Sequence, residues 1–347
     1  MSLEQLVELS REYGSDPRWV LAGGGNTSYK DDSALYVKAS GFPLATIGPE
    51  GFARMRRPEL AKMWQSSYPE ETAEREAATL ADLMAARAEG EEKRPSVETL
   101  MHELFPYPYV IHTHPALVNG LTCSQDGEAA ARRLFGDRLL WVPAIEPGYV
   151  LAVEMRRLAQ RHAEARGEHP RIVMLQNHGL VITGESADEI RALHREVERT
   201  IRRALVREPD LAEVEFDEAA RDRWLAAIET AWHREVAVEF AANAELARRV
   251  ESREAFEPLA GAFTPDHIVY AGSAPLYLPG TPINAAAGLR SQITSYAGEH
   301  GSEPRIVAVE GLGAFAVAET QKAAATAMAL FADELAIAAC AESFGGA

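Results

Sequence analysis

The stretch Tyr109-Val110-Ile111-His112-Thr113-His114-Pro115 predicts a β-strand that carries two candidate metal ligands. Its first three residues are β-formers, and strand side chains alternate between faces, which puts His112 and His114 on the same face. Two neighbouring imidazoles can bind one divalent cation. Pro115 ends the hydrogen-bonding ladder, so the pair lies at a strand end, where sites are often open. The simpler interpretation is two unrelated histidines on a surface strand, and a third ligand would decide between the two.

Length and composition fit one large or two ordinary domains. The chain has 347 residues, of which 47% are hydrophobic, and a net charge of -17. That charge argues against a nucleic-acid or acidic-membrane partner. Cys123 and Cys340 are the only cysteines, so we expect no disulfide framework and a reducing compartment. The sequence shows no signal-peptide pattern, and no apolar stretch reaches the ~18 to 20 residues of a membrane span. We therefore expect a cytoplasmic protein.

Two corners rich in hydrogen-bond donors flank one predicted strand. The run Gly23-Gly24-Gly25-Asn26-Thr27-Ser28 combines backbone that can approach a ligand closely with polar side chains. Taken alone it is most simply a hairpin turn. The strand Leu35–Lys38 ends in a second small-residue corner, Ala39-Ser40-Gly41. Two such corners joined by a strand are what a phosphate-binding cradle requires.

A carboxylate precedes the histidine strand closely in the chain. Ser96 is a predicted N-cap, followed by an apolar helix face that starts at Leu100. Glu98 would lie in the first turn of that helix, where the helix dipole mildly favours a negative charge. Its simple role is helix-end charge. Its functional role would be that of a general base next to the strand of His112.

A third histidine lies at a turn between two apolar strands. The run Arg171–Gln176 predicts a buried strand, and it turns through Asn177-His178-Gly179 into Leu180–Thr183. A histidine is an unusual choice for packing at such a corner but a suitable metal ligand. Three imidazoles with an open position are typical of a catalytic zinc site, where the cation acts as a Lewis acid. A carboxylate that is not a ligand, such as Glu98, can then move a carbon-bound proton.

The other periodic segments indicate an α/β protein. Capping boxes at Ser2 and Ser186 each predict a helix. Further helices are predicted at 71–88, 150–164 and 217–252, and further strands at 139–142 and 267–270. We expect a catalytic domain at 1–208, a helical linker region at 209–254 and a C-terminal β/α subdomain at 255–347.

The run Arg305–Gly313 resembles the run Arg171–Gly179, and both continue into a strand and a helix. Leu312 then stands where His178 stands, and Tyr270 and Gly272 would replace His112 and His114. The hypothesis is that residues from about 255 onward are a reduced second copy without metal ligands; the alternative is chance similarity of two buried hairpins. Gly311–Ala316 also mimics a dinucleotide-binding fingerprint. We reject that function because a strand, not a helix, is predicted after the glycines.

Five motifs taken together resemble the class II aldolase/adducin family. They occur in the family's order over about residues 20–205: Gly25-Asn26-Thr27-Ser28, Lys38-Ala39-Ser40-Gly41, Ser96-Val97-Glu98 with His102, His112-Thr113-His114-Pro115, and Asn177-His178-Gly179-Leu180. The resemblance implies a three-layer α/β/α fold with a mostly antiparallel central sheet. The C-terminal part is similar to the aldolase portion of bifunctional rhamnulose-phosphate aldolase/short-chain dehydrogenase proteins. Such proteins continue beyond the position of Glu342–Ala347, so the redox half is expected to be absent.

The resemblance also implies roles for individual residues. His112, His114 and His178 would bind Zn²⁺ or another divalent metal, and Glu98 would be the catalytic acid/base. The phosphate of a small sugar-phosphate substrate would be held by Gly25, Asn26, Ser40, Gly41 and Ser96. Val97 departs from the second serine often found in sugar-phosphate aldolases, which weakens the phosphate pocket or indicates a carboxylate instead.

The reaction implied is reversible cleavage of a ketose 1-phosphate, such as rhamnulose 1-phosphate, into dihydroxyacetone phosphate and an aldehyde through a stabilised enediolate. Sugar-phosphate epimerases, dehydratases and decarboxylases share the metal triad and remain alternatives. A non-catalytic, adducin-like binding protein is a third possibility. Members of the family commonly form homotetramers, so a homo-oligomer is expected.

Overall fold

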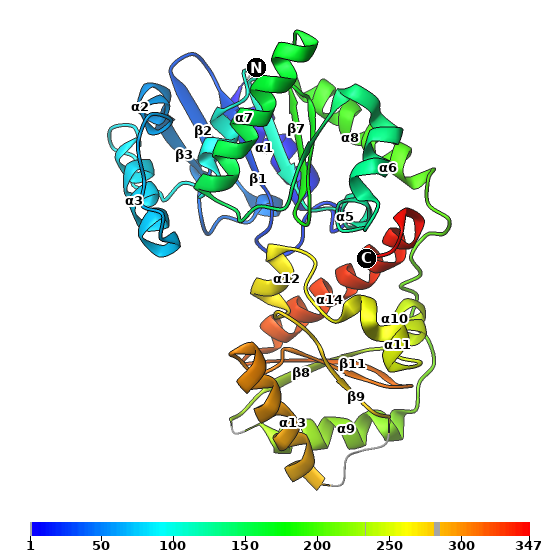
Figure 1. Ribbon diagram of the computed structural model, residues 1–347. Coiled ribbons are helices and arrows are strands. Elements are labelled where there is room, and N and C mark those ends of the chain that lie inside the picture. Colours follow the sequence, from blue (N-terminus) through cyan, green and yellow to red (C-terminus); the bar gives the residue numbers. More distant parts are fainter. Residues whose placement is uncertain (1, 233, 281–284) are drawn as a thin grey trace. The chain divides into compact units, whose positions relative to one another are not determined.

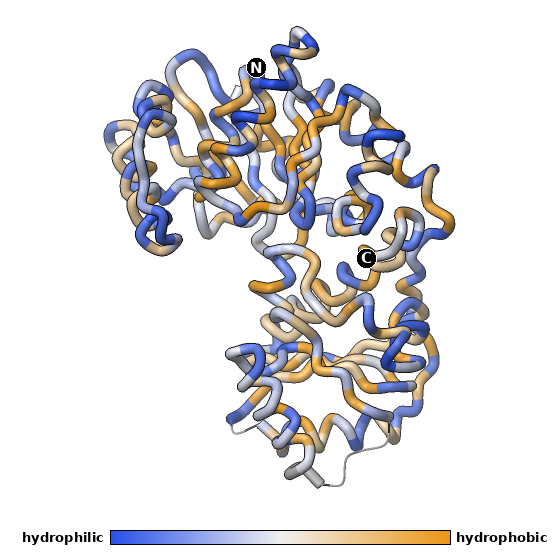
Figure 2. Tube along the Cα trace, in the orientation of Figure 1, coloured by the Kyte–Doolittle hydropathy of each residue, from blue (hydrophilic) through white to orange (hydrophobic). Residues whose placement is uncertain are grey.

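The structure is a computed structural model that describes residues 2–232, 234–280 and 285–347. The chain separates into two compact units, which Figure 1 shows together. The first consists of Met1–Thr122 and Gly127–Arg203, and the second of Cys123–Asp126 and Ala204–Ala347. Figure 2 shows that hydrophobic residues concentrate along the strands of both units.

The first unit is built on a seven-stranded sheet with the order β3-β2-β1-β4-β7-β6-β5. Its strands are β1 (Asn26–Lys30), β2 (Ala34–Lys38), β3 (Phe52–Arg56), β4 (Tyr109–Thr113), β5 (Leu139–Val142), β6 (Ile172–Leu175) and β7 (Gly179–Gly184). Neighbouring strands are antiparallel throughout, except that β5 and β6 are parallel. The predicted mostly antiparallel sheet is therefore confirmed.

Helices cover both faces of this sheet. They are α1 (Leu3–Gly14), α2 (Arg57–Met63), α3 (Thr72–Ala85), α4 (Thr99–Glu103), α5 (Ala116–Thr122), α6 (Gly127–Phe135), α7 (Tyr149–Arg166) and α8 (Ala187–Arg202). Tyr109 donates from its hydroxyl to Gln5 of α1 on one face. Val110 packs with Met101 of α4 and with residues of α7 on the other face. Successive residues of β4 therefore point into different helical layers, which confirms the α/β/α arrangement.

The two predicted capping boxes begin α1 and α8. Ser2 accepts a hydrogen bond from the backbone N–H of Gln5, and Ser186 accepts one from that of Glu189. Each satisfies a donor that the first helical turn leaves unpaired.

The second unit contains a four-stranded sheet with the order β8-β11-β10-β9. Its strands are β8 (Ala237–Ala241), β9 (Leu276–Leu278), β10 (Ile306–Val309) and β11 (Gly313–Ala318). Its helices are α9 (Glu218–Ala231), α10 (Ala244–Arg249), α11 (Arg253–Phe256), α12 (Pro265–Tyr270), α13 (Ala285–His300) and α14 (Gln321–Ala341). The strand β11 confirms that the glycines at Gly311–Gly313 do not open a dinucleotide-binding helix.

Two element predictions in the second unit are wrong. Residues 217–252 are not helical throughout, because Ala237–Ala241 pairs with β11 as a strand. Conversely, the expected strand 267–270 belongs to α12, which begins with Pro265 after the extended residue Thr264. Proline is favoured at a first helical position, and a short β-branched run does not outweigh that start. The segment 209–254, expected as a linker, contributes a strand to the second sheet.

The helix α14 also corrects an expectation. The stretch Gln321–Phe344 is long and apolar enough to cross a membrane by length and composition. However, 67% of its apolar window is buried inside the protein, and α14 contacts β8, β11 and α12. A mostly buried helix of this kind is a core helix of the second unit.

A buried ion pair in the second unit gives a stability prediction. Arg207 donates to both carboxylate oxygens of Glu245 at 2.7 Å, and the Glu245 side chain is 0% exposed. Arg207→Met should lower the free energy of unfolding by about 3 kcal/mol, because the buried carboxylate loses both of its short ionic hydrogen bonds and keeps only Arg249 at 3.9 Å and the Asp210 N–H at 3.5 Å. Arg223→Met is the control, since Arg223 is 59% exposed and lies 4.0 Å from Asp217. Urea denaturation followed by circular dichroism measures both variants, and equal midpoints would contradict the prediction.

Candidate metal and substrate site

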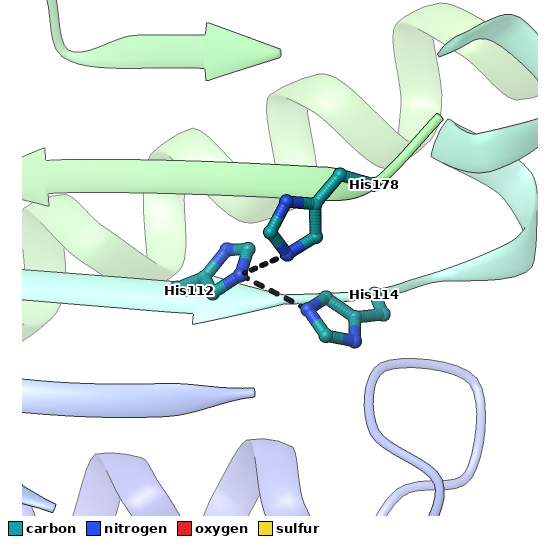
Figure 3. A group of neighbouring side chains, drawn as sticks. All are labelled: His112, His114 and His178. Atoms are coloured by element: carbon teal, nitrogen blue, oxygen red, sulfur yellow. Dashed lines mark hydrogen bonds between the residues drawn. The ribbon is translucent and has the colours of Figure 1, made fainter. Parts of the chain in front are cut away.

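Three histidines from two neighbouring strands converge at one end of the first sheet, as Figure 3 shows. His112 lies near the end of β4, His114 directly follows that strand, and His178 lies in the turn between β6 and β7. The Nε2 atom of His112 is 2.9 Å from Nε2 of His114 and 3.2 Å from Nε2 of His178. His178 therefore lies close enough to His112 and His114 to be the third ligand.

The turn that carries His178 is fixed by steric constraints. Asn177 adopts a left-handed φ of 54°, which asparagine tolerates better than most residues. A Cβ on Gly179 would lie 2.5 Å from the carbonyl oxygen of Thr113 and 2.8 Å from the ring of His114. Only glycine lets this corner approach the end of β4 so closely. Asn119 donates to the backbone carbonyl of His178 and supports the corner from α5.

The histidine geometry fits a metal ion. The Nδ1 atom of His112 donates to the backbone carbonyl of Leu180 at 3.0 Å, so its Nε2 lone pair faces the other two rings. Zinc–nitrogen bonds of about 2.0–2.1 Å in a tetrahedral site separate ligand nitrogens by about 3.3 Å. The candidate ligand atoms of the three residues all lie within 4.8 Å of one another. The three imidazoles can therefore hold one divalent cation.

Glu98 faces the histidines without belonging to the ligand cluster. Its Oε2 lies 3.7 Å from Nε2 of His112, and its Oε1 lies 3.6 Å from Nε2 of His178. Burial by itself would raise the pKa of Glu98, but the His112 and His178 rings and the Asn26 amide lower it to about 2. Among the described residues, Oε1 has no hydrogen-bond partner. Glu98 is therefore ionised, and Oε1 is the oxygen that is left to accept a proton from a bound substrate.

Glu98 is held through a chain of three buried side chains. Asn26, directly opposite His112 in the β1–β4 pairing, donates from Nδ2 to Glu98 Oε2 at 2.5 Å. A carboxylate only accepts, so the Asn26 carbonyl oxygen must point the other way, toward Nε2 of His102. The Nδ1 atom of His102 is 2.8 Å from the Ser28 hydroxyl. Burial lowers the pKa of His102 to about 3, so the ring is neutral and donates from Nε2 to Asn26.

The predicted anion-binding residues lie at the same end of the sheet. Gly25 has a φ of +66°, and a Cβ there would lie 2.8 Å from the His112 carbonyl oxygen, so the position requires glycine. Ser96 accepts from Asn26 at 3.4 Å. Ser40 donates to the Pro95 carbonyl at 3.4 Å, and Gly41 has open space beside it. Asn26 and Ser96 therefore adjoin Glu98, Gly25 adjoins His112, and Ser40 with the following Gly41 adjoins Pro95; the role of these five residues in substrate binding stays a prediction.

One detail of the sequence prediction is corrected. The helix α4 begins at Thr99, so Glu98 and not Ser96 occupies the N-cap position. Ser96 instead accepts a hydrogen bond from the backbone N–H of Glu98 at 3.2 Å. Val97 between them is 44% exposed.

Sequence reasoning gave no individual role to His102 or Asn119, and it placed Ser28 only among the polar side chains of the glycine-rich corner. The three side chains are buried, and each bonds to a group that supports the site. Ser28 and His102 belong to family motifs, whereas Asn119 is marked only by its polarity among apolar neighbours, which a satisfied core residue shares. The partners are 59 to 76 positions apart and become visible only in the fold.

The site predicts one tightly bound divalent cation that depends on His178. Loss of an outer-shell partner costs about 10- to 100-fold in metal affinity, so His178→Ala should lower Zn²⁺ affinity by at least that much. His162→Ala, on the partly exposed α7 of the same unit, is the control and should bind like the unchanged chain. Titration against a competing chelator measures both, and an unchanged affinity in His178→Ala would contradict the assignment.

Comparisons with known proteins identify the family of the first unit. Residues 4–205, more than half of the chain, match the family model described as Class II Aldolase and Adducin N-terminal domain. A Bacillus subtilis (strain 168) protein described as the uncharacterized oxidoreductase YuxG is 30% identical over 197 residues. Those residues are 54% of this chain but only 27% of that relative, so the chain spans about a quarter of its length.

A solved structure extends the similarity. The N-terminal class II aldolase domain of a conserved protein from Thermoplasma acidophilum has a TM-score of 0.50 and 27% identity, covering 58% of this chain and 93% of that one. The family resemblance indicated by the five motifs is confirmed, while the closer similarity to rhamnulose-phosphate aldolase/dehydrogenase proteins stays a prediction. By its fold, its motifs and the family match, the chain belongs to the class II aldolase/adducin family.

Proposed function

We propose that the chain is a metal-dependent aldolase that reversibly cleaves a ketose 1-phosphate, such as rhamnulose 1-phosphate, into dihydroxyacetone phosphate and an aldehyde. The observation that supports this most is the position of Glu98. Its carboxylate lies 3.6 to 3.7 Å from two of the three convergent imidazoles, those of His112 and His178, and keeps one oxygen without a hydrogen bond from the described residues. A binding protein has no need for an ionised, buried carboxylate in that position.

A divalent cation, Zn²⁺ in this proposal, would supply Lewis-acid polarisation of the substrate's oxygens. The chain's own residues then bind and orient the substrate. Backbone N–H groups and hydroxyls at Gly25, Ser40, Gly41 and Ser96 would hold the phosphate, with Asn26 beside them. In the cleavage direction Glu98 would accept the proton of the hydroxyl that becomes the aldehyde, the carbon–carbon bond would break, and Glu98 would return that proton to the carbon of the dihydroxyacetone part. In the synthetic direction the same carboxylate removes that proton.

An epimerase, dehydratase or decarboxylase of the same family would use the same groups. Val97 weakens the proposed phosphate site and would suit a substrate with a carboxylate instead. Its exposed apolar side chain stands between Ser96 and Glu98 and adds no hydroxyl to the anion site. Incubation with candidate ketose phosphates and chromatography of the products separates these reactions. Release of dihydroxyacetone phosphate supports the aldolase, whereas a purified chain that contains no zinc or other divalent ion supports the adducin-like binding protein.

The proposed setting follows from the family and the charge. We propose a cytoplasmic homo-oligomer, a tetramer as in many family members, that acts on a small sugar phosphate. The net charge of -17 supports neither a nucleic-acid partner nor an acidic membrane surface. Light scattering of the purified chain tests the assembly.

Glu98→Gln tests the assigned acid/base. The amide keeps the shape of the side chain but cannot exchange the proton, so the turnover number should fall by about 10²- to 10⁴-fold. Zn²⁺ content should stay that of the unchanged chain, because Glu98 is not a ligand. Both are measured on the same preparation, and full cleavage activity in this variant would refute the role.

His102→Ala tests the chain of hydrogen bonds behind Glu98. Loss of the ring leaves the Asn26 carbonyl oxygen without its donor, and a buried group without its partner costs about 1–3 kcal/mol. If that cost falls on the orientation of Glu98, the turnover number should drop about 5- to 150-fold, while Zn²⁺ affinity stays unchanged. The pH at which the reaction rate is half-maximal should shift as well, which a purely structural role would not cause. An unaltered turnover number in a folded variant would contradict the role.

A further inference from the structure

We infer that the second unit is a degenerate copy of the ligand-bearing half of the first unit, and that it holds no metal ion because apolar residues occupy the ligand positions. The inference rests on the metal site of the first unit and does not depend on which reaction that unit catalyses. It corrects the earlier hypothesis in extent and in residues, since the copy begins well before residue 255.

The first observation is strand order and direction. The first sheet contains the sequence of neighbours β4-β7-β6-β5, and the whole second sheet is β8-β11-β10-β9. In both, the first two pairings are antiparallel and the last is parallel. A chance similarity of two hairpins would not extend to a third and fourth strand with matching directions.

The second observation is the register. The hairpin β6–β7 pairs Ile172 with Ile182 and Leu175 with Gly179. The hairpin β10–β11 pairs Ile306 with Ala316 and Val309 with Gly313, which is the same register after one constant shift in numbering. The outer pairing matches as well, residue for residue: β4 with β7 runs from Tyr109↔Gly184 to Thr113↔Leu180, and β8 with β11 runs from Ala237↔Ala318 to Ala241↔Ala314.

The two units also share a set of hydrogen bonds that lie outside the strands, each set being formed within its own unit. In the first unit, the corner residues bond as Gln176 N–H to Val142 O, Asn177 N–H to Thr122 O and His178 N–H to Leu175 O. At the shifted positions, the second unit shows Glu310 N–H to Leu278 O, Gly311 N–H to Val250 O and Leu312 N–H to Val309 O. The corner of the second hairpin is therefore anchored to the same places in its unit.

The same steric constraint recurs at both corners. Gly311 takes a left-handed φ of 69° where Asn177 has 54°. A Cβ on Gly313 would lie 2.5 Å from the carbonyl oxygen of Ala241, just as one on Gly179 would lie 2.5 Å from that of Thr113. Glycine is required at Gly179 and at Gly313 because each corner lies so close to its neighbouring strand. This requirement does not depend on a bound metal.

The flanking helices correspond in order and in packing. The helices α4, α5, α7 and α8 have counterparts in α9, α10, α13 and α14. The helix α9 packs on α13 as α4 packs on α7, and α14 packs on β11 as α8 packs on β7. Thr320 caps α14 by accepting from the third following N–H, as Ser186 does for α8.

This correspondence identifies the residues in the ligand positions. Phe240 pairs with Phe315 as His112 pairs with Val181, so Phe240 takes the place of His112. Ala242 and Leu312 then take the places of His114 and His178, and the position of Glu98 falls on Ala226. Tyr270 and Gly272 are not the counterparts, because they belong to α12 and the residues after it.

Aromatic and aliphatic contacts occupy the former site. The ring of Phe240 lies 4.8 Å from that of Phe315 and 4.9 Å from that of Phe216. Phe240 and Leu312 both pack against the core cluster of the second unit. Apolar packing therefore takes the place of metal ligation on a shared backbone frame, and none of the described residues at the three ligand positions of the second unit can bind a divalent cation.

Metal counting tests this directly. The unchanged chain, dialysed and analysed by mass spectrometry, should contain one Zn²⁺ per chain, and the variant His112→Ala/His114→Ala/His178→Ala should contain none. Two ions in the unchanged chain, or one retained in that variant, would overturn the inference. Metal content is read here and the Co²⁺ spectrum in the experiment below, so neither test depends on enzyme activity.

A graft tests the preserved frame. Phe240→His/Ala242→His/Leu312→His, introduced into the chain without its own triad, should restore one bound ion, seen with Co²⁺ as the visible d–d bands of a low-symmetry site. The matched control Phe240→Ala/Ala242→Ala/Leu312→Ala should bind none. A folded graft that binds no Co²⁺ would refute the correspondence. If the triple graft unfolds, the double graft Ala242→His/Leu312→His keeps Phe240 in the core. Weaker Co²⁺ binding by this double graft would support the correspondence, and no Co²⁺ binding would refute it.

Discussion

The antiparallel pairing of β4 with β1 on one side and β7 on the other is the constraint on which the site depends. The first pairing sets Asn26 opposite His112, and the second brings the corner of His178 over the end of β4. Side chains alternate between the two faces along a strand, so a slip of one residue in either pairing would turn a ligand or its support to the opposite face. Gly25 and Gly179 stabilise both registers. The backbone of Gly25 lies against the carbonyl oxygen of His112, and that of Gly179 lies against the carbonyl oxygen of Thr113, the last residue of β4.

The electrostatics of the site follow from burial. An isolated carboxylate in this position would be costly, and Glu98 is tolerated because three imidazoles and one amide face it. His102 stays neutral in the same surroundings, which fixes its tautomer and thereby the orientation of Asn26. The anion-binding corners add backbone N–H groups to a chain that is strongly acidic as a whole. Local geometry, not net charge, would allow such a chain to hold the anionic substrate that we propose.

The second unit shows which features of this architecture belong to the fold and which to the chemistry. The hairpin register, the left-handed corner and the glycine after it occur in both units. The three ligand histidines, Glu98 and Asn119 belong to the first unit, and residues of other types stand at the corresponding positions of the second. Backbone geometry therefore persists under packing constraints alone, whereas ligand side chains are readily replaced by apolar ones that contribute to a core. The family model ends at residue 205, so the copy lies outside the part of the chain that the family match describes.

The sequence by itself determined the local features and the chemistry-bearing residues. Capping boxes defined where α1 and α8 begin, alternation defined β4, and five motifs in order identified the family and named the three histidines and Glu98. Tertiary structure decided what depends on residues far apart in the chain. It made a strand of Ala237–Ala241, whose neighbours favour helix, because β11 offers its edge for pairing. It made a helix of Pro265–Tyr270, and it gave His102 and Phe240 their places. Strand pairing joins positions by hydrogen bonds that leave no periodic trace in either segment, so only the folded chain reveals them.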